Sequence, residues 1–463
     1  MVFKRSLLAA SVAATLIASG AAHATNGYFS HGYGVKSMGM GGGGVALPND
    51  SAMIIATNPA GITETGTQIN FDISWFHPVR GYEFSNTMGG QPAGSGSADS
   101  GSSNFYMPEL SASYAIDDTN SIGIAIYGNG GMNTDFSGAD DGNYLGFPGI
   151  AATGPYGDGP AGVNLKQMFI APTYGHKFMN GKLSVGASLL FARQTIQVKG
   201  LGNFNGTGPV AQAFGLPPFT LDPNHFTSNE VSHSTGWGGK IGVLYHATDA
   251  ISLAGSYQTK MHMSKFDEYS GLFAEGGKFD IPSTWTVGGA FKVAPAWTLT
   301  ADFQRINYSD VKAISNPSTE YLFGCMMGDT SKCLGGSNGA GFGWKNVNVV
   351  KLGAQWQMTP ALQLRVGFNH GTNPVGSEDA LFNTIAPGVV KNHYTAGFTY
   401  AIDKHQEVSG AFMYAPTVTV SGTNPLLTQL AAGAMPPGSP AFNQDLSIHM
   451  KQYEATIGYA YKF

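Results

Sequence analysis

Apolar residues alternate with small or polar residues over the last eleven positions of the chain. From Tyr453 to Phe463, the odd positions carry aromatic or aliphatic side chains and the even positions carry Glu, Thr, Gly, Ala and Lys. Successive side chains of a β-strand point to opposite faces, so one face of this segment meets an apolar medium and the other meets water. The pattern predicts an amphipathic strand, either in a soluble sheet or in a transmembrane barrel.

The same alternation recurs in about fourteen segments separated by turn residues. We expect strands at residues 68–75, 104–114, 121–127, 165–174, 183–198, 232–246, 251–263, 278–293, 297–308, 345–357, 362–370, 391–401, 406–417 and 445–463. Short connections, such as 179–182 and 358–361, alternate with long ones, such as 128–164 and 418–444. Short turns on one rim and long loops on the other are typical of bacterial outer-membrane barrels, so the fold class is an all-β transmembrane barrel of about fourteen antiparallel strands.

The amino end of the chain is typical of a secretory signal peptide. Lys4 and Arg5 precede an apolar run over residues 7–17, and a site of small residues follows at 22–24. No later stretch reaches the roughly 18 to 20 apolar residues that a transmembrane helix needs. An exported chain without a helical anchor, ending in an aromatic amphipathic strand, is expected in the outer membrane of a Gram-negative bacterium.

Composition agrees with a barrel. Glycine supplies 65 of the 463 residues, and charged residues supply 11%, against about 25% in a typical soluble domain. The inward face of a barrel needs small side chains, and tight turns need glycine. The net charge of -5 and the lack of a basic run argue against a nucleic-acid partner.

The two cysteines, Cys325 and Cys333, lie close together in a glycine-rich stretch. In an oxidising compartment we expect them to form a disulfide within a loop. A metal site needs more ligands than this pair supplies, so we expect no metal and no other cofactor.

Residues 25–66 do not alternate. They are glycine-rich, apolar and nearly uncharged. A compact segment before the first strand is either a periplasmic tail or a plug inside the barrel, and the apolar content favours the plug. The expected organisation is a signal peptide at 1–24, a plug at 25–66, and a barrel with long extracellular loops at 67–463.

Several short motifs resemble those of the FadL family of long-chain fatty-acid transporters, which includes uptake channels for aromatic hydrocarbons. The motifs are Asn-Gly-Tyr-Phe at 26–29, Gly-Tyr-Gly at 32–34, Ser-Met-Gly-Met-Gly at 37–41, Ala-Thr-Asn-Pro-Ala-Gly at 56–61, Gly-Trp-Gly-Gly at 236–239, Ile-Pro-Ser-Thr-Trp at 281–285 and the terminal Phe463. The resemblance spans the mature chain and implies a fourteen-stranded barrel with an amino-terminal plug, or hatch.

Asn58, Pro59 and Ala60 lie in the expected plug. Proline fixes φ and donates no hydrogen bond, so the tripeptide is suited to a hinge or a stiff turn. The resemblance implies a hatch that shifts when ligand binds. An ordinary turn is the alternative.

Gly128, Asn129 and Gly130 follow the third expected strand. A cluster of glycines is a site where a strand bulges or kinks. The resemblance implies a kink that opens the wall sideways, which suits a hydrophobic cargo because release into water would lose its burial. A flexible start to a long loop is the alternative.

Two of the long loops are unusually apolar. One contains Phe147 and Ile150, and the other contains Phe214, Leu216 and Phe219. Exposed apolar patches mark interaction sites, so we expect these side chains to capture cargo. They could equally pack on one another to cover the barrel mouth.

The resemblance places Arg193 at a position that contacts a fatty-acid carboxylate, and Lys312 less securely at another. The bidentate fork of arginine suits a carboxylate. However, the odd positions of this strand, such as Leu189 and Phe191, carry the lipid-facing side chains, so Arg193 faces the lumen only if a bulge reverses the parity.

These features predict a monomeric, non-enzymatic outer-membrane channel for passive uptake of hydrophobic molecules, foremost long-chain fatty acids. Its expected partners are those molecules, the lipid bilayer with its lipopolysaccharide, and the barrel assembly machinery, which should read Phe463. Hydrocarbon uptake by the same route is the first alternative, and an outer-membrane lipid hydrolase is the second, although no catalytic arrangement of Ser, His and an acidic residue stands out. A general porin would need charged inward faces and no plug.

Overall fold

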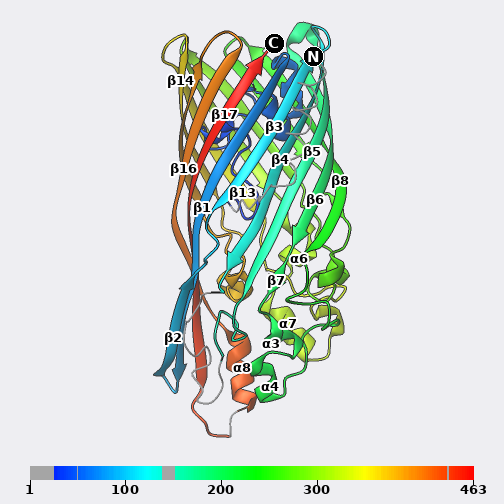
Figure 1. Cartoon of the computed structure of the whole chain (residues 1–463), viewed down its shortest axis with the longest axis vertical. Helices are drawn as coiled ribbons and strands as arrows, with labels where there is room; N and C mark the ends of the chain where they lie inside the picture. The colour runs from blue at the N-terminus through cyan, green and yellow to red at the C-terminus, as the bar shows by residue number, and fades with distance from the viewer. Residues whose placement is uncertain (1–24, 50, 138–151, 435–436) are drawn as a thin grey trace, which may run out of the picture.

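The computed structural model describes residues 25–49, 51–137, 152–434 and 437–463, and within them one antiparallel sheet closes into a barrel (Figure 1). Closure follows because β1 pairs with β17 on one side and with β3 on the other. Of the seventeen described strands, β2, β7 and β10 are additions to the loops and the other fourteen form the wall, which confirms the expected fold. The strands are β1 (Gln68–Met88), β2 (Gln91–Asp99), β3 (Phe105–Ala115), β4 (Asn120–Asp135), β5 (Gly162–Phe178), β6 (Leu183–Ile196), β7 (Val198–Lys199), β8 (Ser232–Thr248), β9 (Ile251–Gln258), β10 (His262–Met263), β11 (Thr284–Ala294), β12 (Trp297–Ile306), β13 (Val347–Gln357), β14 (Leu362–Gly371), β15 (Asn392–Ala401), β16 (Gln406–Thr423) and β17 (Phe442–Lys462).

The two rims differ as the sequence predicts. Short turns and the carboxyl end of the chain lie at the top of Figure 1, and the long loops, with most of the helices, lie at the bottom. The α-helices are α2 (Val35–Met38), α3 (Gly202–Asn205), α4 (Pro209–Phe214), α5 (Ala274–Gly277), α6 (Lys312–Ser315), α7 (Thr319–Met326) and α8 (Pro425–Ala434). The 3-10 helices are η1 (Ala52–Ala56), η2 (Pro59–Glu64), η3 (Met179–Gly181), η4 (Asp267–Tyr269), η5 (Tyr308–Asp310), η6 (Thr330–Lys332), η7 (Ser377–Asp379) and η8 (Phe382–Thr384). None of these helices in the described part of the chain has the length and apolar content to cross a bilayer.

Strand alternation sorts the side chains of the wall into two environments. On β6, Leu189 and Phe191 are exposed on the outside, whereas Ser184 and Ser188 are buried on the inside. The outward aliphatic and aromatic side chains form the surface that meets lipid, because a barrel that spans a bilayer places its apolar face outward.

Residues 25–49 and 51–65 lie inside the barrel and are almost entirely buried (Figure 1). Strands from different parts of the wall hold them. The Asp302 carboxylate of β12 accepts hydrogen bonds from the amides of Gly44 (2.7 Å) and Val45 (3.0 Å), and Lys351 of β13 donates to the carbonyl of Gly42 (3.1 Å). These charge-assisted bonds pair the polar backbone of the plug with the polar inward face.

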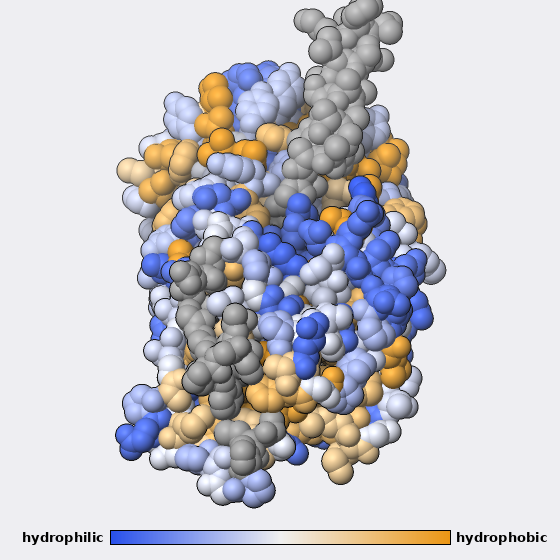
Figure 2. Space-filling model, turned by 60° about the horizontal axis from the view of Figure 1, so that its bottom comes forward, coloured by the Kyte–Doolittle hydropathy of each residue, from blue (hydrophilic) through white to orange (hydrophobic). Residues whose placement is uncertain are grey.

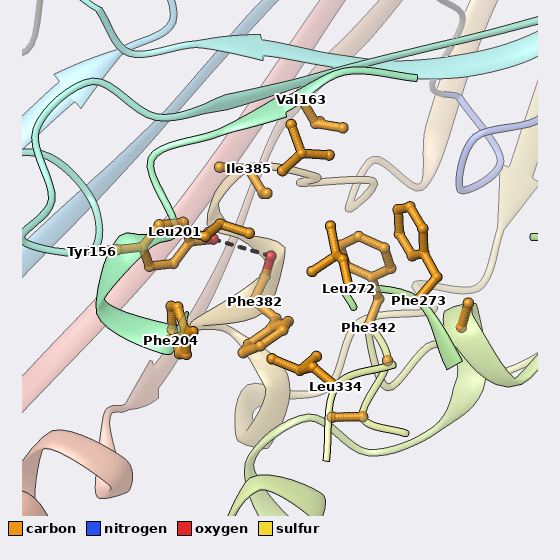
Figure 3. Close-up of a pocket in the computed structure, with 14 residues that line it drawn as sticks. Tyr156, Val163, Leu201, Phe204, Leu272, Phe273, Leu334, Phe342, Phe382 and Ile385 are labelled. Atoms are coloured by element: carbon orange, nitrogen blue, oxygen red, sulfur yellow. Dashed lines mark hydrogen bonds between the residues drawn. The ribbon is translucent and has the colours of Figure 1, made fainter. Parts of the chain in front are cut away.

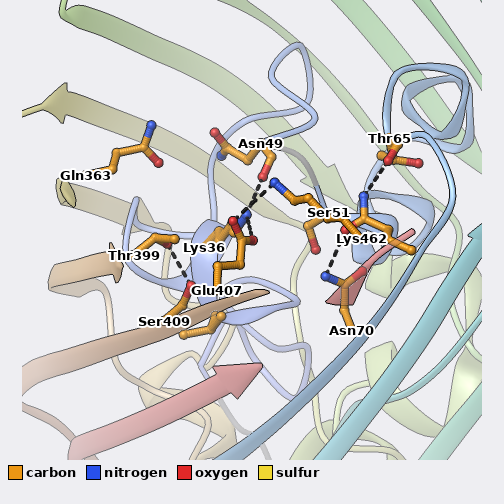
Figure 4. Close-up of polar contacts among 12 residues, drawn as sticks. Lys36, Asn49, Ser51, Thr65, Asn70, Gln363, Thr399, Glu407, Ser409 and Lys462 are labelled. Atoms are coloured by element: carbon orange, nitrogen blue, oxygen red, sulfur yellow. Dashed lines mark hydrogen bonds and ion pairs between the residues drawn. The ribbon is translucent and has the colours of Figure 1, made fainter. Parts of the chain in front are cut away.

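An ion-pair cluster fastens α2 of the plug to the wall near the periplasmic rim (Figure 4). Lys36 pairs with Glu407 of β16 and donates to the Asn49 carbonyl (2.9 Å). Lys462 of β17 pairs with the other oxygen of Glu407 at 3.2 Å. Asn70 of β1 accepts from the amide at the start of η1 (3.0 Å). The plug is therefore bonded to both ends of the barrel sequence.

The first hairpin differs from the expectation. β1 continues to Met88 instead of ending at 75, and the connection expected between the strands at 68–75 and 104–114 contains β2. Beyond Trp75, Pro78 and Gly81 interrupt the alternation, so the pattern fades although the strand goes on.

Candidate functional site

An apolar cavity lies among the long loops, beside the loop ends of β5 and β7 (Figure 3). It is lined by Tyr156, Val163, Val198, Leu201, Phe204, Leu272, Phe273, Ala313, Leu334, Ala340, Gly341, Phe342, Phe382 and Ile385. The cavity volume is only about 20 Å³. The cavity is therefore nearly closed in this conformation, and a cargo must spread its walls.

The lining offers almost nothing to a charged group. Its one side-chain hydroxyl, on Tyr156, donates to the Phe382 carbonyl at 3.3 Å (Figure 3). Burying an ion without a partner is very costly, so the lining selects for uncharged molecules or uncharged parts of molecules.

A second apolar pocket lies farther out, between α8 and the loop that carries α3 and α4. It shares Tyr156 and Phe204 with the first cavity, and Leu216 and Phe219 line it together with leucines of α8. Phe204 packs edge-on against Tyr156 at 5.7 Å and against Phe382 at 5.3 Å between ring centroids. These rings form a constriction between the two apolar spaces.

The disulfide shapes one wall of both pockets. Cys325 and Cys333 are bonded, and Leu334 follows directly. The Leu334 amide donates to the Phe219 carbonyl (2.9 Å), and the Leu221 amide donates to the Leu334 carbonyl (3.1 Å). The bridge thus holds Leu334 in the cavity while it fixes the neighbouring apolar loop.

A buried carboxylate ties two more loops together. Asp379 accepts from the amide (2.7 Å) and the hydroxyl (2.6 Å) of Ser318. Burial raises the pKa of Asp379 above its ordinary value, and the two hydrogen bonds from Ser318 oppose that shift.

Apolar surface is also exposed at the loop end. Figure 2 looks partly onto that end and shows apolar surface along the lower part of the view, with strongly polar surface at its right. Met326 and Met327 are exposed within the loop that the disulfide closes, and Leu221 is exposed beside that loop. The loops therefore present an apolar surface to the outside as well as an apolar interior.

The barrel wall is interrupted between β3 and β4. The two strands pair only from Ala115–Ser121 to Leu110–Ile126, although β3 begins at Phe105 and β4 continues to Asp135. Past this point β4 pairs with β5 alone, and the register shifts between Gly128 and Gly130, which makes Asn129 a bulge. The bulge lies where the sequence predicts one.

The first residues of the plug occupy the inner side of this interruption. The Ser30 amide donates to the Asn129 carbonyl, and the Gly131 amide donates to the Tyr28 carbonyl, both at 3.1 Å. A side chain at Gly130 would meet the Tyr28 carbonyl oxygen at 1.7 Å, so only glycine permits this approach. The plug therefore replaces, for this stretch of β4, the backbone partners that β3 does not supply.

Asn58 anchors the plug instead of leaving it free to bend. Its Oδ1 accepts from the Ala60 amide (3.1 Å), and its Nδ2 donates to the carbonyls of Val45 (3.0 Å) and Val243 (3.2 Å). Pro59 then starts η2, where a missing amide proton costs nothing. A Cβ at Gly242 of β8 would meet Asn58 Oδ1 at 2.0 Å, so the plug packs directly on the wall.

Arg193 does not face the lumen, which makes the expected carboxylate contact wrong. β6 pairs with β8 from Leu183 to Ile196 without a register shift, so the parity set by Leu189 and Phe191 carries through to Arg193. Its guanidinium lies on the outer surface, 3.5 Å from His233 Nδ1.

Lys312 lies on the outer side of the cavity wall. It pairs with Glu275 at 3.3 Å and donates to the Ser337 carbonyl at 2.8 Å, while its neighbour Ala313 lines the cavity. Phe214 is half-buried against the loop core. Phe147, Ile150 and the signal peptide at 1–24 lie outside the described residues.

Sequence reasoning missed most of the cavity. Tyr156, Phe204, Phe342 and Phe382 come from separate loops, where no periodicity marks them. The only sequence signal is the apolar content of the loops around Phe204. Among the described residues, no cluster of His, Cys, Asp and Glu is arranged to hold a metal ion.

A closed barrel with an internal plug, an apolar loop cavity and an interrupted wall defines a plugged outer-membrane channel. The chain belongs to the family of outer membrane protein transport proteins (OMPP1/FadL/TodX), whose model matches residues 11–435. It is therefore an outer-membrane channel of the kind that carries hydrophobic compounds.

Solved structures share this fold at low sequence identity. A FadL homologue of Pseudomonas aeruginosa superposes with a TM-score of 0.64 at 15% identity, covering 94% of this chain and 100% of that one. The toluene transporter TodX of P. putida gives 0.59 at 16%, covering 94% and 99%. The toluene transporter TbuX of Ralstonia pickettii gives 0.56 at 16%, with the same coverage. No curated protein matches the sequence significantly.

Proposed function

We propose that the channel admits small uncharged hydrophobic molecules, of which monoaromatic hydrocarbons are the model class. The observation that supports this cargo is the lining of the inner cavity, which consists of aliphatic and aromatic side chains and one tyrosine whose hydroxyl donates to a backbone carbonyl. A solved channel of the same fold is described as a toluene transporter. Apolar burial, at about 25 cal/mol per Å², is the driving force for entry, and no energy source is needed.

The proposed route begins at the exposed apolar surface of the loops. Cargo enters the outer pocket beside α8, passes the constriction of Tyr156 and Phe204, and reaches the inner cavity. Both pockets are narrow, so passage requires ring rotation and loop displacement. Loops are the least stable parts of a rigid scaffold and meet this requirement.

The proposed exit is the interruption between β3 and β4. Displacement of Tyr28 to Ser30 from the Asn129 bulge would uncover it, whereas the part of the plug around Asn58 stays bonded to the wall. Lateral exit keeps an apolar cargo out of water on its way to the membrane.

A filled cavity tests the cargo route. Ala313→Phe adds a ring inside the inner cavity, and Ala396→Phe adds the same ring on the lipid-facing side of β15 as a matched control. In a strain that lacks the native channel, we expect uptake of labelled toluene to fall at least tenfold for the first variant and to stay unchanged for the second. Equal uptake by both variants at equal outer-membrane abundance would contradict the route.

Removal of the bulge tests the exit. Deleting Asn129 brings β4 and β5 into continuous register, because Gly128 and Gly130 already pair with consecutive residues of β5. We expect toluene still to bind the purified variant while uptake by cells is lost. Normal uptake would show that cargo leaves by another path.

Long-chain fatty acids are the second candidate, and Lys312 is the observation that favours them. Its ammonium group lies at the loop surface beside the cavity wall, where a carboxylate could remain outside while the chain is buried. If so, Lys312→Gln should reduce uptake of oleate about tenfold and leave toluene uptake unchanged, since a hydrogen bond to a charged group contributes about 1.5 kcal/mol or more. Equal effects on both cargoes would remove this candidate.

A further inference from the structure

Arg193 belongs to a group of basic side chains on the outer surface of the barrel. Across the sheet it lies opposite Met168 of β5 and Thr235 of β8. Lys166, two residues nearer the long loops on β5, points outward with the same parity as Met168. His233, two residues nearer the loops on β8, lies within 3.5 Å of the Arg193 guanidinium. Three adjacent strands thus present basic groups on one face at one level.

A second basic group continues the row at the next strands. Lys260, Lys278 and His262 surround one carboxylate oxygen of Asp280, at 3.1, 3.4 and 3.7 Å. Asp280 is buried beneath them, whereas His262 is exposed and lies opposite Trp237 of β8. One carboxylate therefore neutralises only part of the charge that these side chains carry at the surface.

The height of this row follows from strand geometry. Arg193 is ten residues beyond Leu183, where β6 leaves the short-turn rim. At roughly 3.3 Å per residue and a tilt of about 40°, it lies about 25 Å from that rim, in the direction of the long loops. The lipid-facing apolar band of such barrels is about 25 Å tall, so the basic row lies at the outer edge of the band, at the level of the outer-leaflet headgroups.

The outer surface of the wall between the basic row and the short-turn rim is apolar. Phe191 and Trp237 face each other across β6 and β8, and Leu189 and Ile241 lie farther down on the same outward face. Trp237 is 65% exposed, and the two adjacent glycines of β8, at 238 and 239, leave the wall thin beside it. Acyl chains can pack along this surface directly beneath a headgroup that contacts the basic row.

We propose that this surface binds a phosphorylated glycolipid of the outer leaflet, the lipid A part of lipopolysaccharide, with its phosphates on Arg193 and Lys166 and its acyl chains on Phe191 and Trp237. Arginine binds phosphate oxygens through two parallel N–H bonds, and lysine binds them as a point charge. Among the described residues, one carboxylate, that of Asp280, forms ion pairs with any of the lysine and arginine side chains of the row (Lys166, Arg193, Lys260 and Lys278), so the surface carries the charge that a phosphorylated lipid complements.

The position of the site relates it to the wall interruption. Lys166 lies directly opposite Gly131 of β4, next to the Asn129 bulge. A lipid A molecule on this surface would border the gap between β3 and β4 and keep the outer-leaflet end of the gap covered, while the gap stays open toward the inside of the membrane. This role goes beyond uptake of cargo and does not depend on which cargo is carried.

Binding of lipid A to the purified full-length protein tests the proposal. Native mass spectrometry in detergent would compare diphosphorylated lipid A with the same lipid after removal of its phosphates, for the unaltered protein and for Lys166→Gln/Arg193→Gln. We expect the unaltered protein to prefer the phosphorylated lipid and the double variant to bind it about tenfold more weakly, as loss of a charge-assisted contact implies. The phosphate-free lipid should bind both proteins equally.

Two further variants separate a site from general charge. Lys292→Gln/Lys404→Gln removes two exposed lysines at the opposite rim and should leave lipid A binding unchanged. Lys166→Arg/Arg193→Lys keeps both charges and should retain most of the binding, and heat-resistant migration on gels verifies the fold of each variant. The proposal would be overturned if Lys166→Gln/Arg193→Gln bound phosphorylated lipid A as tightly as Lys292→Gln/Lys404→Gln does. It would also be overturned if the unaltered protein did not prefer the phosphorylated lipid.

Discussion

Replacement of Asn58 by alanine should loosen the plug without opening the barrel. The side chain is fully buried and makes three hydrogen bonds, which cap η2 and join the plug to itself and to β8. Its removal leaves the Ala60 amide and the Val45 carbonyl buried without that partner. An unsatisfied buried group costs about 1–3 kcal/mol, so the local stability of the plug should fall by about 3 kcal/mol.

This loss of stability sets the fraction of molecules in which the plug is locally open. About 3 kcal/mol corresponds to roughly a 150-fold rise in the fraction of open plug. Hydrogen–deuterium exchange measured by mass spectrometry on the protein in detergent should therefore speed up about 150-fold in peptides that cover 52–64, while strand peptides keep their protection.

Two variants control this experiment. Asn58→Ser keeps the oxygen that caps η2 but loses both donations, so its exchange should lie between those of the unaltered protein and Asn58→Ala. Asn346→Ala removes an asparagine that accepts one hydrogen bond in a loop and should leave peptides 52–64 unchanged. Unchanged exchange of 52–64 in a correctly folded Asn58→Ala protein would refute the role of Asn58 as an anchor.

Three shorter predictions follow from other parts of the molecule. Deletion of Phe463 should lower the amount of protein in the outer membrane without changing the uptake per inserted channel, and an unchanged amount would contradict a role in assembly. Replacing Cys325 and Cys333 by serine should free the turn before Leu334 by roughly 2–3 kcal/mol of loop-closure entropy, seen as faster exchange over 325–334; equal exchange would show that packing alone holds the turn. Arg193→Ala should leave the ratio of oleate to oleyl-alcohol uptake unchanged because the side chain faces outward, and a selective loss of the acid would contradict that orientation.

The barrel could be predicted from the sequence because successive side chains of each wall strand face lipid and the barrel interior in turn, which makes apolar and polar residues alternate. Strand β14 begins at Leu362 as expected and ends one residue later than expected, since its alternation is unbroken. The β1–β2 hairpin was missed because Pro78 and Gly81 break the pattern. The adjacent glycines at the turn, Gly89 and Gly90, both have positive φ (58° and 77°), and such a pair is the sequence signal that would have located β2.

The site was less accessible to sequence reasoning. The parity of Leu189 and Phe191 already placed Arg193 on the outside, and the expectation that it binds cargo required a bulge that β6 does not have. The bulge at Asn129 was predictable because glycines flank it. The cavity was not, because its walls meet only after the loops around Phe204 and Phe382 fold onto one another across a long sequence separation.

The position of the plug constrains the order in which the molecule can be assembled. The Val35 amide donates to Asp72 of β1 (3.3 Å), and the Thr456 hydroxyl of β17 donates to Met38 Sδ (3.3 Å), so the plug touches both strands of the seam between the first and last strands. If the wall had already closed, the plug would have to enter a lumen that has no more room than the plug itself occupies. We expect the seam to zip shut around a plug that is already inside, which makes the pairing of the first and last strands the step that commits the chain to its topology.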